Sequence, residues 1–133
     1  MTSTPAEVVR RFWAARAEAD AGTTRELLDP AVTWRVVGRG HPVARTFHGP
    51  DGFLGELGPM LGSAFVPGSR TLEITNLIAA GDQVVTELHE TMTGRNGHDV
   101  VLDIVTVMRV ADGRITECRE YMDLAEVHAA YPA

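Results

Sequence analysis

Residues 83–123 read QVVTELHETMTGRNGHDVVLDIVTVMRVADGRITECREYMD, and most of the information about the fold lies in this stretch. Apolar and polar residues alternate along three runs, a pattern typical of half-buried strands. Short glycine-containing segments at 95–97 and 111–113 separate the runs and predict hairpins. We therefore expect antiparallel strands over 83–93, 99–110 and 114–123.

The segments outside this stretch add helices first and further strands afterwards. Helical spacing of apolar residues, with Thr4 as N-cap and Pro5 at the first helical position, predicts a first helix over 4–21, with Gly22 at its end. Helices gathered before antiparallel strands indicate an α+β fold rather than an alternating βαβ fold. The other expected elements are helices at 24–28, 50–61 and 124–131 and strands at 32–37, 45–48 and 70–79.

Composition excludes several classes of function. The 133 residues fit one domain, 1–133. All 12 basic residues are Arg, so a lysine Schiff base and a P-loop are excluded. The net charge of −6 and the lack of a basic stripe argue against nucleic acid and membrane surfaces as partners. The expected ligand is therefore a small molecule or another protein. No signal-peptide pattern and no apolar run of membrane-spanning length occurs, so we expect a cytoplasmic protein.

Two glutamates fall on strand faces that are otherwise apolar. Three-residue loops at 95–97 and 111–113 would set Glu90 opposite Leu102 and Glu120 opposite Ile104, which puts both acids on one concave surface. A two-residue Asn96-Gly97 turn would instead pair Glu90 with Asp103. We disfavour that register because it sets two acids against each other and scrambles the apolar face.

Burial of these two carboxyl groups would give them catalytic properties. Desolvation raises a carboxyl pKa, and two neighbouring acids divide into one protonated and one ionised group, which supplies a general acid and a general base. The alternative is that Glu90 and Glu120 lie at a solvated rim. The expected substrate pocket around them comprises Trp34, Val36, Leu88, Met92, Leu102, Ile104, Cys118 and Met122.

Other reactive side chains fit structural roles better. Cys118, the single cysteine, is interpreted as a buried hydrophobe, because no histidine is placed to activate it. The loop histidines His41, His48 and His98 match no metal-ligand spacing, so we expect no metal and no cofactor. His89 is expected opposite Asp103 on the outer face of the sheet. That pair is either an acid/base pair or, as we favour, part of a hydrogen-bonded dimer interface.

The order of elements resembles a known family. The residues that carry the resemblance are Phe12-x-x-Ala15, DPAVTW at 29–34, FHGPDG at 47–52, RVADGRI at 109–115 and REYMD at 119–123. They are similar to the SnoaL-like branch of the nuclear transport factor 2-like superfamily. The resemblance implies a cone-shaped α+β barrel, with N-terminal helices packed on a strongly curved, mixed and mainly antiparallel sheet. It also implies a pocket inside the cone and a homodimer through the outer sheet face.

Relatives in this superfamily include ketosteroid isomerase, scytalone dehydratase, limonene epoxide hydrolase and polyketide cyclases, which work on compact apolar molecules. Glu120 occupies the place of the proton-transferring acid on the last strand of the hydrolase and cyclase patterns, and Glu90 matches a second acid. Leu88 stands where the hydrolase has an arginine, and Trp34 and Val36 replace its water-holding tyrosine and asparagine. The tyrosine donor of the isomerase has no counterpart here.

The resemblance and the two acids together lead to a functional hypothesis. We expect a cofactor-independent acid/base enzyme that acts on a compact, largely apolar small molecule by cyclisation, isomerisation, elimination or epoxide opening. Secondary metabolism is one setting for such an enzyme. The alternative is a non-catalytic small-molecule-binding or dimerisation domain of the same fold.

Overall fold

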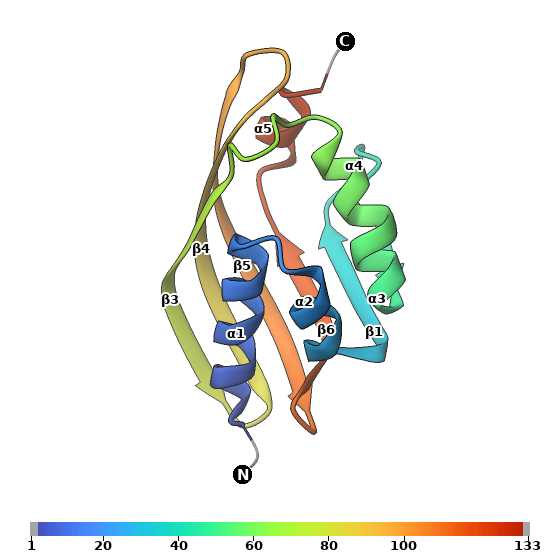
Figure 1. Ribbon diagram of the computed structural model, residues 1–133, viewed down its shortest axis with the longest axis vertical. Coiled ribbons are helices and arrows are strands. Elements are labelled where there is room, and N and C mark those ends of the chain that lie inside the picture. The colour runs from blue at the N-terminus through green and yellow to red at the C-terminus, as the bar shows by residue number, and fades with distance from the viewer. Residues whose placement is uncertain (1–2, 132–133) are drawn as a thin grey trace.

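A computed structural model describes residues 3–131, which form a six-stranded sheet with helices packed on its concave face (Figure 1). The α+β prediction is confirmed. The elements are α1 (Pro5–Ala17), α2 (Ala21–Leu27), β1 (Leu28–Val37), β2 (Thr46–His48), α3 (Gly49–Asp51), the π-helical turn η1 (Gly52–Leu57), α4 (Gly58–Gly62), β3 (Thr71–Ala80), β4 (Gln83–Thr93), β5 (Asp99–Ala111), β6 (Arg114–Tyr121) and α5 (Leu124–His128).

The sheet is mixed, with strand order β2-β1-β6-β5-β4-β3. β1 and β6 run parallel and all other neighbours are antiparallel. β2 and β3 are edge strands, so the sheet is curved and open rather than a closed barrel. Register shifts in three of the strand pairs are the kind of irregularity that bends and twists a sheet.

The first helix ends earlier than its apolar spacing predicts. α1 begins after the Thr4 cap as expected but ends at Ala17, and Ala19 adopts a left-handed φ of 55°. Asp20 then caps a second helix by accepting a hydrogen bond from the Thr23 backbone N–H. Gly22 therefore lies inside α2 and does not end α1, because the Asp20 cap offers the chain a new helix start.

The helical run from 49 to 62 is continuous but not regular. Its middle is a π-helical turn, and Pro59 follows directly in α4. A proline inside a regular α-helix clashes with the carbonyl four residues earlier, and a widened turn relieves that clash. The predicted helix over 50–61 thus exists, with Phe53 and Leu57 buried against the core.

The β4–β5 register is the predicted one. Leu88 pairs with Ile104 and Glu90 with Leu102, and the Gly94 N–H donates to the His98 carbonyl to close the three-residue loop. The alternative pairing of Glu90 with Asp103 does not occur.

The β5–β6 register differs from the prediction by two residues. Asp112 and Gly113 both have positive φ and form a two-residue turn of type I′, whose twist matches the flanking strands. A register shift after Val110 then places Glu120 opposite Thr106 instead of Ile104. Because side chains alternate with a period of two, an error of two residues leaves Glu120 on the predicted face.

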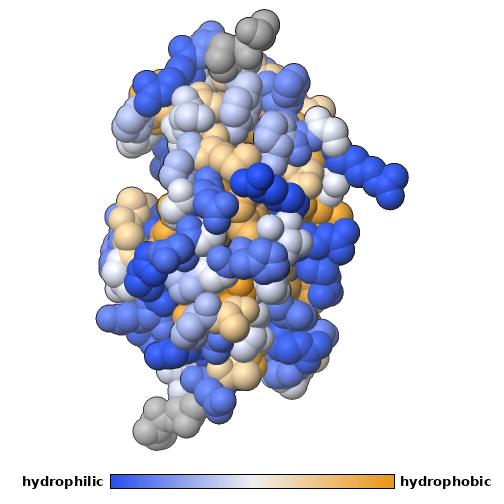
Figure 2. All heavy atoms as spheres, turned by 90° about the vertical axis from the view of Figure 1, so that its right-hand side faces the viewer, coloured by the Kyte–Doolittle hydropathy of each residue, from blue (hydrophilic) through white to orange (hydrophobic). Residues whose placement is uncertain are grey.

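One face of the sheet packs on the helices, and the other is not covered by any helix of residues 3–131. α1 lies across β3, β4 and β5 (Figure 1). The side of the molecule that carries α3 and α4 is largely polar, with apolar atoms in small separate groups (Figure 2). In the described part of the chain, no helix is long and apolar enough to cross a membrane.

Candidate active site

A cavity of about 630 Å³ lies between the helices and the concave face of the sheet. Both predicted acids, Glu90 and Glu120, lie on its wall. The predicted wall residues that line it are Trp34, Met92, Leu102, Ile104 and Met122. The helices contribute further apolar side chains, among them Trp13, Phe53 and Leu57.

Three residues assigned to the pocket do not line it. Val36, Leu88 and Cys118 face the interior, but each is at most 2% exposed and belongs to the hydrophobic core. An inward-facing position on a strand does not suffice, because the helices pack directly on part of the concave face. Burial also raises the pKa of the Cys118 thiol well above its ordinary value, so the thiol stays protonated.

Glu120 is the most deeply buried acid of the cavity, with 7% of its surface exposed. The indole N–H of Trp34 donates to its Oε1 at 3.1 Å. The Trp34 ring is fixed in turn by Phe53, with ring centroids 4.4 Å apart. Among residues 3–131 the other carboxyl oxygen, Oε2, has no hydrogen-bond partner. One oxygen is therefore anchored and the other is left for a ligand.

The electrostatic environment of Glu120 favours its protonated form. Burial, which is the largest cause, and the charge of Glu90 together raise the pKa of Glu120 to about 7. The hydrogen bond from Trp34 and the charge of Arg70 act in the opposite direction. A carboxyl group with a pKa near neutrality exists as both acid and base at physiological pH.

Glu90 has a different partner. Its Oε2 accepts a charge-assisted hydrogen bond from Nη2 of Arg70 at 3.2 Å, and its side chain is 11% exposed. Burial raises the pKa of Glu90, and the Arg70 guanidinium opposes this shift by charge and by hydrogen bonding. Glu90 and Glu120 are therefore not equivalent, because of the two only Glu90 forms an ion pair.

The observed register spreads the two acids along the sheet. Glu90 pairs with Leu102, whereas Glu120 pairs with Thr106, four residues further along β5. The predicted register separated them by only two residues. Thr106 is itself buried, and its hydroxyl is hydrogen-bonded to the hydroxyl of Thr86 on β4. The residues beside Glu120 on the two neighbouring strands are therefore polar and already have hydrogen-bond partners.

Two cavity residues, Arg16 and Arg70, are absent from the sequence-based site. Arg16 follows Val9, Phe12 and Trp13 at helical spacing on α1, and both Trp13 and Arg16 line the cavity. Arg70 directly precedes β3 and also lines the cavity. The signal was present, because a basic residue that continues an apolar stripe must point toward the interior.

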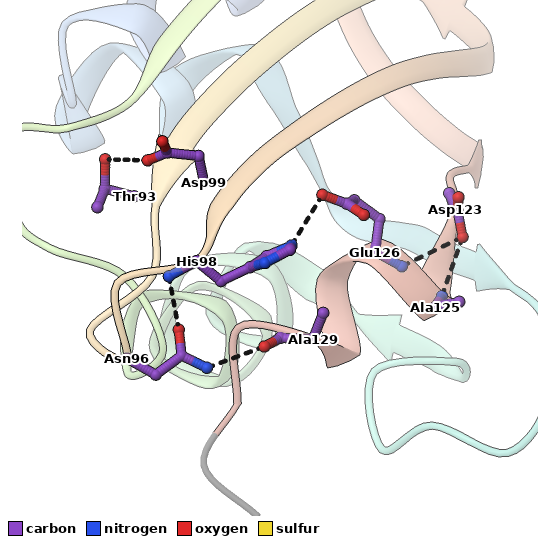
Figure 3. A network of polar contacts seen from close by, with 8 residues as sticks. All are labelled: Thr93, Asn96, His98, Asp99, Asp123, Ala125, Glu126 and Ala129. Atoms are coloured by element: carbon purple, nitrogen blue, oxygen red, sulfur yellow. Dashed lines mark hydrogen bonds and ion pairs between the residues drawn. The ribbon is translucent and has the colours of Figure 1, made fainter.

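The C-terminal helix closes one end of the cavity, and Val127 of α5 lines it. Figure 3 shows how the helix is attached to the β4–β5 loop. Asn96 Nδ2 donates to the Ala129 carbonyl at 2.9 Å, and His98 Nε2 lies 3.1 Å from Glu126 Oε1 (Figure 3). Asp123 caps α5 by accepting from the N–H groups of Ala125 and Glu126.

The histidines considered as metal ligands lie apart. His98 pairs with Glu126, as described above, while His41 packs against the rings of His128 and Tyr131. His48 lies at the end of β2. Among residues 3–131, no group of three His, Cys, Asp or Glu side chains is arranged to hold a metal ion.

The outer face of the sheet carries the predicted His89–Asp103 pair. His89 Nδ1 lies 3.0 Å from Asp103 Oδ1, and the Asp103 side chain is 87% exposed. Tyr121 of β6 also faces outward and lies opposite Val105. This pair points away from the cavity and cannot reach a ligand inside it.

These features define a class of protein: an α+β cone whose apolar cavity holds two unequal carboxyl groups. The chain belongs to the SnoaL-like domain family, whose model matches residues 9–118. A search of the curated proteins found no match.

Solved structures of similar proteins share the fold. An NTF2-like protein from Burkholderia thailandensis E264 is 26% identical, with a TM-score of 0.86 over 98% of this chain and 99% of that one. IdmH, a putative polyketide cyclase from Streptomyces antibioticus, is 23% identical, with a TM-score of 0.79 over 96% and 98%. An LEH-like epoxide hydrolase from M. tuberculosis is 23% identical, with a TM-score of 0.73 over 97% and 90%.

Proposed function

We propose that the protein is a cytoplasmic, cofactor-independent acid/base enzyme for a compact, largely apolar small molecule. The observation that carries the proposal is Glu120: a buried carboxyl group on the wall of an apolar cavity, with one oxygen held by Trp34 and a pKa of about 7. A group poised in this way can accept a proton from one position of a ligand and return it at another.

The reaction type follows from what surrounds Glu120. As a carboxylate it would remove a proton from a carbon next to a carbonyl group, and as the resulting carboxylic acid it would return that proton to the product. Glu90, paired with Arg70, would remain ionised and raise the basicity of Glu120. This proton balance fits an isomerisation or an aldol-type cyclisation.

Epoxide opening fits the site less well. It requires a water molecule held beside the base, whereas Trp34 uses its N–H on Glu120 and Val36 is buried in the core. The similarity of the fold to IdmH, a putative polyketide cyclase, supports cyclisation as the favoured class of reaction.

The proposal can be tested without the natural substrate, by using 5-nitrobenzisoxazole. Removal of the C3–H proton of its isoxazole ring by a carboxylate base breaks the N–O bond and gives a coloured cyanonitrophenolate. We expect turnover that rises with pH through about 7, as Glu120 ionises. Glu120→Gln keeps the size of the side chain but removes the base, and it should lower the rate at least ~100-fold.

Glu117→Gln is the matched control. Glu117 lies on the same strand but contacts Arg109 and Arg119, not the cavity wall, so its substitution should leave the rate unchanged. Equal rates for wild type and Glu120→Gln would contradict the proposed role of Glu120. Binding of the compound without any turnover would favour the non-catalytic alternative.

We also propose that two copies associate through the outer sheet face. Several large apolar side chains are exposed on it, with Ile78 at 59% and Val101 at 52% exposure, alongside Val105 and Tyr121. Exposed apolar groups of this kind mark interaction surfaces. Light scattering should give the mass of a dimer for the wild type and of a monomer for Val105→Arg, and a wild-type monomer would contradict the proposal.

A further inference from the structure

Arg16 and Arg70 lie on the cavity wall, and the proton-transfer chemistry proposed above gives Arg16 no role. Arg16 comes from the last turn of α1 and Arg70 from the residue before β3, so two distant parts of the sequence bring two guanidinium groups to one cavity. Guanidinium groups are the usual partners of carboxylates, because their N–H groups match the two carboxylate oxygens.

The Arg16 side chain is held in a defined orientation. Its Nε donates to Oγ1 of Thr24 at 2.9 Å, and the Thr24 hydroxyl donates in turn to the backbone carbonyl of Asp20 at 2.8 Å. Thr24 is fully buried. The guanidinium carbon also lies 5.7 Å from the centre of the Phe53 ring, which supports one face of the group. Nη1 and Nη2 make no hydrogen bond to any of residues 3–131.

Arg16, unlike Arg70, has no carboxylate of residues 3–131 as an ion-pair partner. The carboxyl oxygens of Asp20 accept from Thr23, and Glu18, although on the cavity wall, is exposed at the end of α1. Arg70 supplies Nη2 to Glu90. Burial and the positive charge of Arg70 both lower the pKa of Arg16, and the smaller effect of the Asp20 charge opposes them.

Two neighbouring cations in a partly desolvated cavity are unfavourable unless an anion lies between them. From this arrangement we infer that Arg16 and Arg70 form a subsite for a carboxylate on the ligand, so that the substrate is a compact apolar acid and not a neutral molecule. This inference rests on the proposed function in one respect, because it places the ligand in the same cavity as Glu120.

Calorimetric titration of the full chain with a pair of matched ligands tests the subsite. 2-Naphthoate and 2-naphthamide share the same fused rings and differ in charge. At about pH 8, where the naphthoate is ionised, wild-type protein should bind it about 10- to 100-fold more tightly than the amide, the usual range for hydrogen bonds to a charged group. Arg16→Gln should remove most of this preference.

Arg11→Gln is the matched control, since Arg11 is an exposed arginine of the same helix and does not line the cavity. The Arg11→Gln variant should prefer the naphthoate to the amide as strongly as the wild type does. Arg16→Lys keeps the charge but not the two Nη donors, and should give an intermediate preference. If Arg16→Gln does not fold, Arg16→Lys alone provides the comparison, because it leaves the Arg70–Glu90 ion pair intact.

Equal affinities of the wild type for the two ligands would overturn the inference, and so would an Arg16→Gln variant that retains the full preference. Failure of the proposed acid/base function would affect the rate of proton transfer and not the preference for the carboxylate. Glu120→Gln should keep the preference for the carboxylate while proton transfer is lost, so the two results can be read independently.

Discussion

The two faces of the sheet place their acidic side chains in opposite environments, one buried and the other exposed to water. His89 and Glu90 are consecutive residues of β4, yet Glu90 points into the cavity and His89 points outward to Asp103. On the inner face, burial raises the pKa of Glu90 and of Glu120. On the outer face, the Asp103 side chain is 87% exposed to water. The environment that each face provides, rather than the type of residue, raises the pKa of the inner acids and leaves Asp103 in contact with water.

The largest expected effect on stability comes from the ionisation of Glu120. Its pKa is about 7 in the folded chain against an ordinary value of 4.5. The folded state therefore binds more protons between these values, so the free energy of unfolding should fall as pH rises from about 4.5 through about 7. The full penalty above that range is about 3 kcal/mol, at 1.36 kcal/mol for each pKa unit.

Glu120→Gln should remove this penalty, because its amide stays neutral. The difference in free energy of unfolding between the variant and the wild type should therefore be about 3 kcal/mol more favourable at about pH 8 than at about pH 4. Urea denaturation of both proteins at the two pH values measures the difference. Asp103→Asn is the outer-face control and should show no comparable gain. A gain for Glu120→Gln that does not depend on pH would contradict the account.

The second effect concerns the ion pair of Glu90. Arg70→Gln leaves a buried carboxylate without its cation, which should cost about 2 kcal/mol at about pH 8. The cost stays below that of breaking a fully buried pair, because the Arg70 side chain is 37% exposed. At about pH 5 the loss should be smaller, since Glu90 can then take up a proton. Denaturant titrations at both pH values would show this, and an unchanged stability at about pH 8 would argue against a buried, ionised Glu90.

The smallest effect is expected on the outer face. His89→Gln removes the contact with Asp103, and pairs at exposed positions contribute at most ~1 kcal/mol. We expect a change in the free energy of unfolding of about 0.5 kcal/mol or less, measured by the same denaturant titrations. A loss as large as that of Arg70→Gln would mean that the two faces do not differ as described.

The side of the sheet that each strand residue faces could be predicted from the sequence, because alternation of polar and apolar residues is a local property. It assigned Glu90 and Glu120 to the concave surface, and both lie on it. The β5–β6 register could not be read in the same way. Asp112-Gly113 closes a two-residue turn, which displaces the register by one residue, and the register shift between Arg109 and Val110 displaces it by a second residue. The two displacements together return Glu120 to the concave face. Local sequence does not mark such a bulge, because it depends on how the strands twist against each other.

The composition of the cavity wall could be predicted only in part. Leu88 and Cys118 face inward but are covered by packing, which depends on where the helices lie on the sheet. Arg16 and Arg70 lie far apart in the sequence and meet only in the fold. An arginine on an apolar helix stripe was a usable signal, yet its partner on the far side of the cavity could not be found from spacing alone.

We propose that burial tunes Glu120 for proton transfer near neutral pH. The most direct test is an NMR titration that follows the side-chain carboxyl carbon of Glu120 in the folded protein, assigned by comparison with Glu120→Gln. The account predicts a midpoint at about pH 7 for this resonance. A midpoint near the ordinary glutamate value of 4.5 would contradict it.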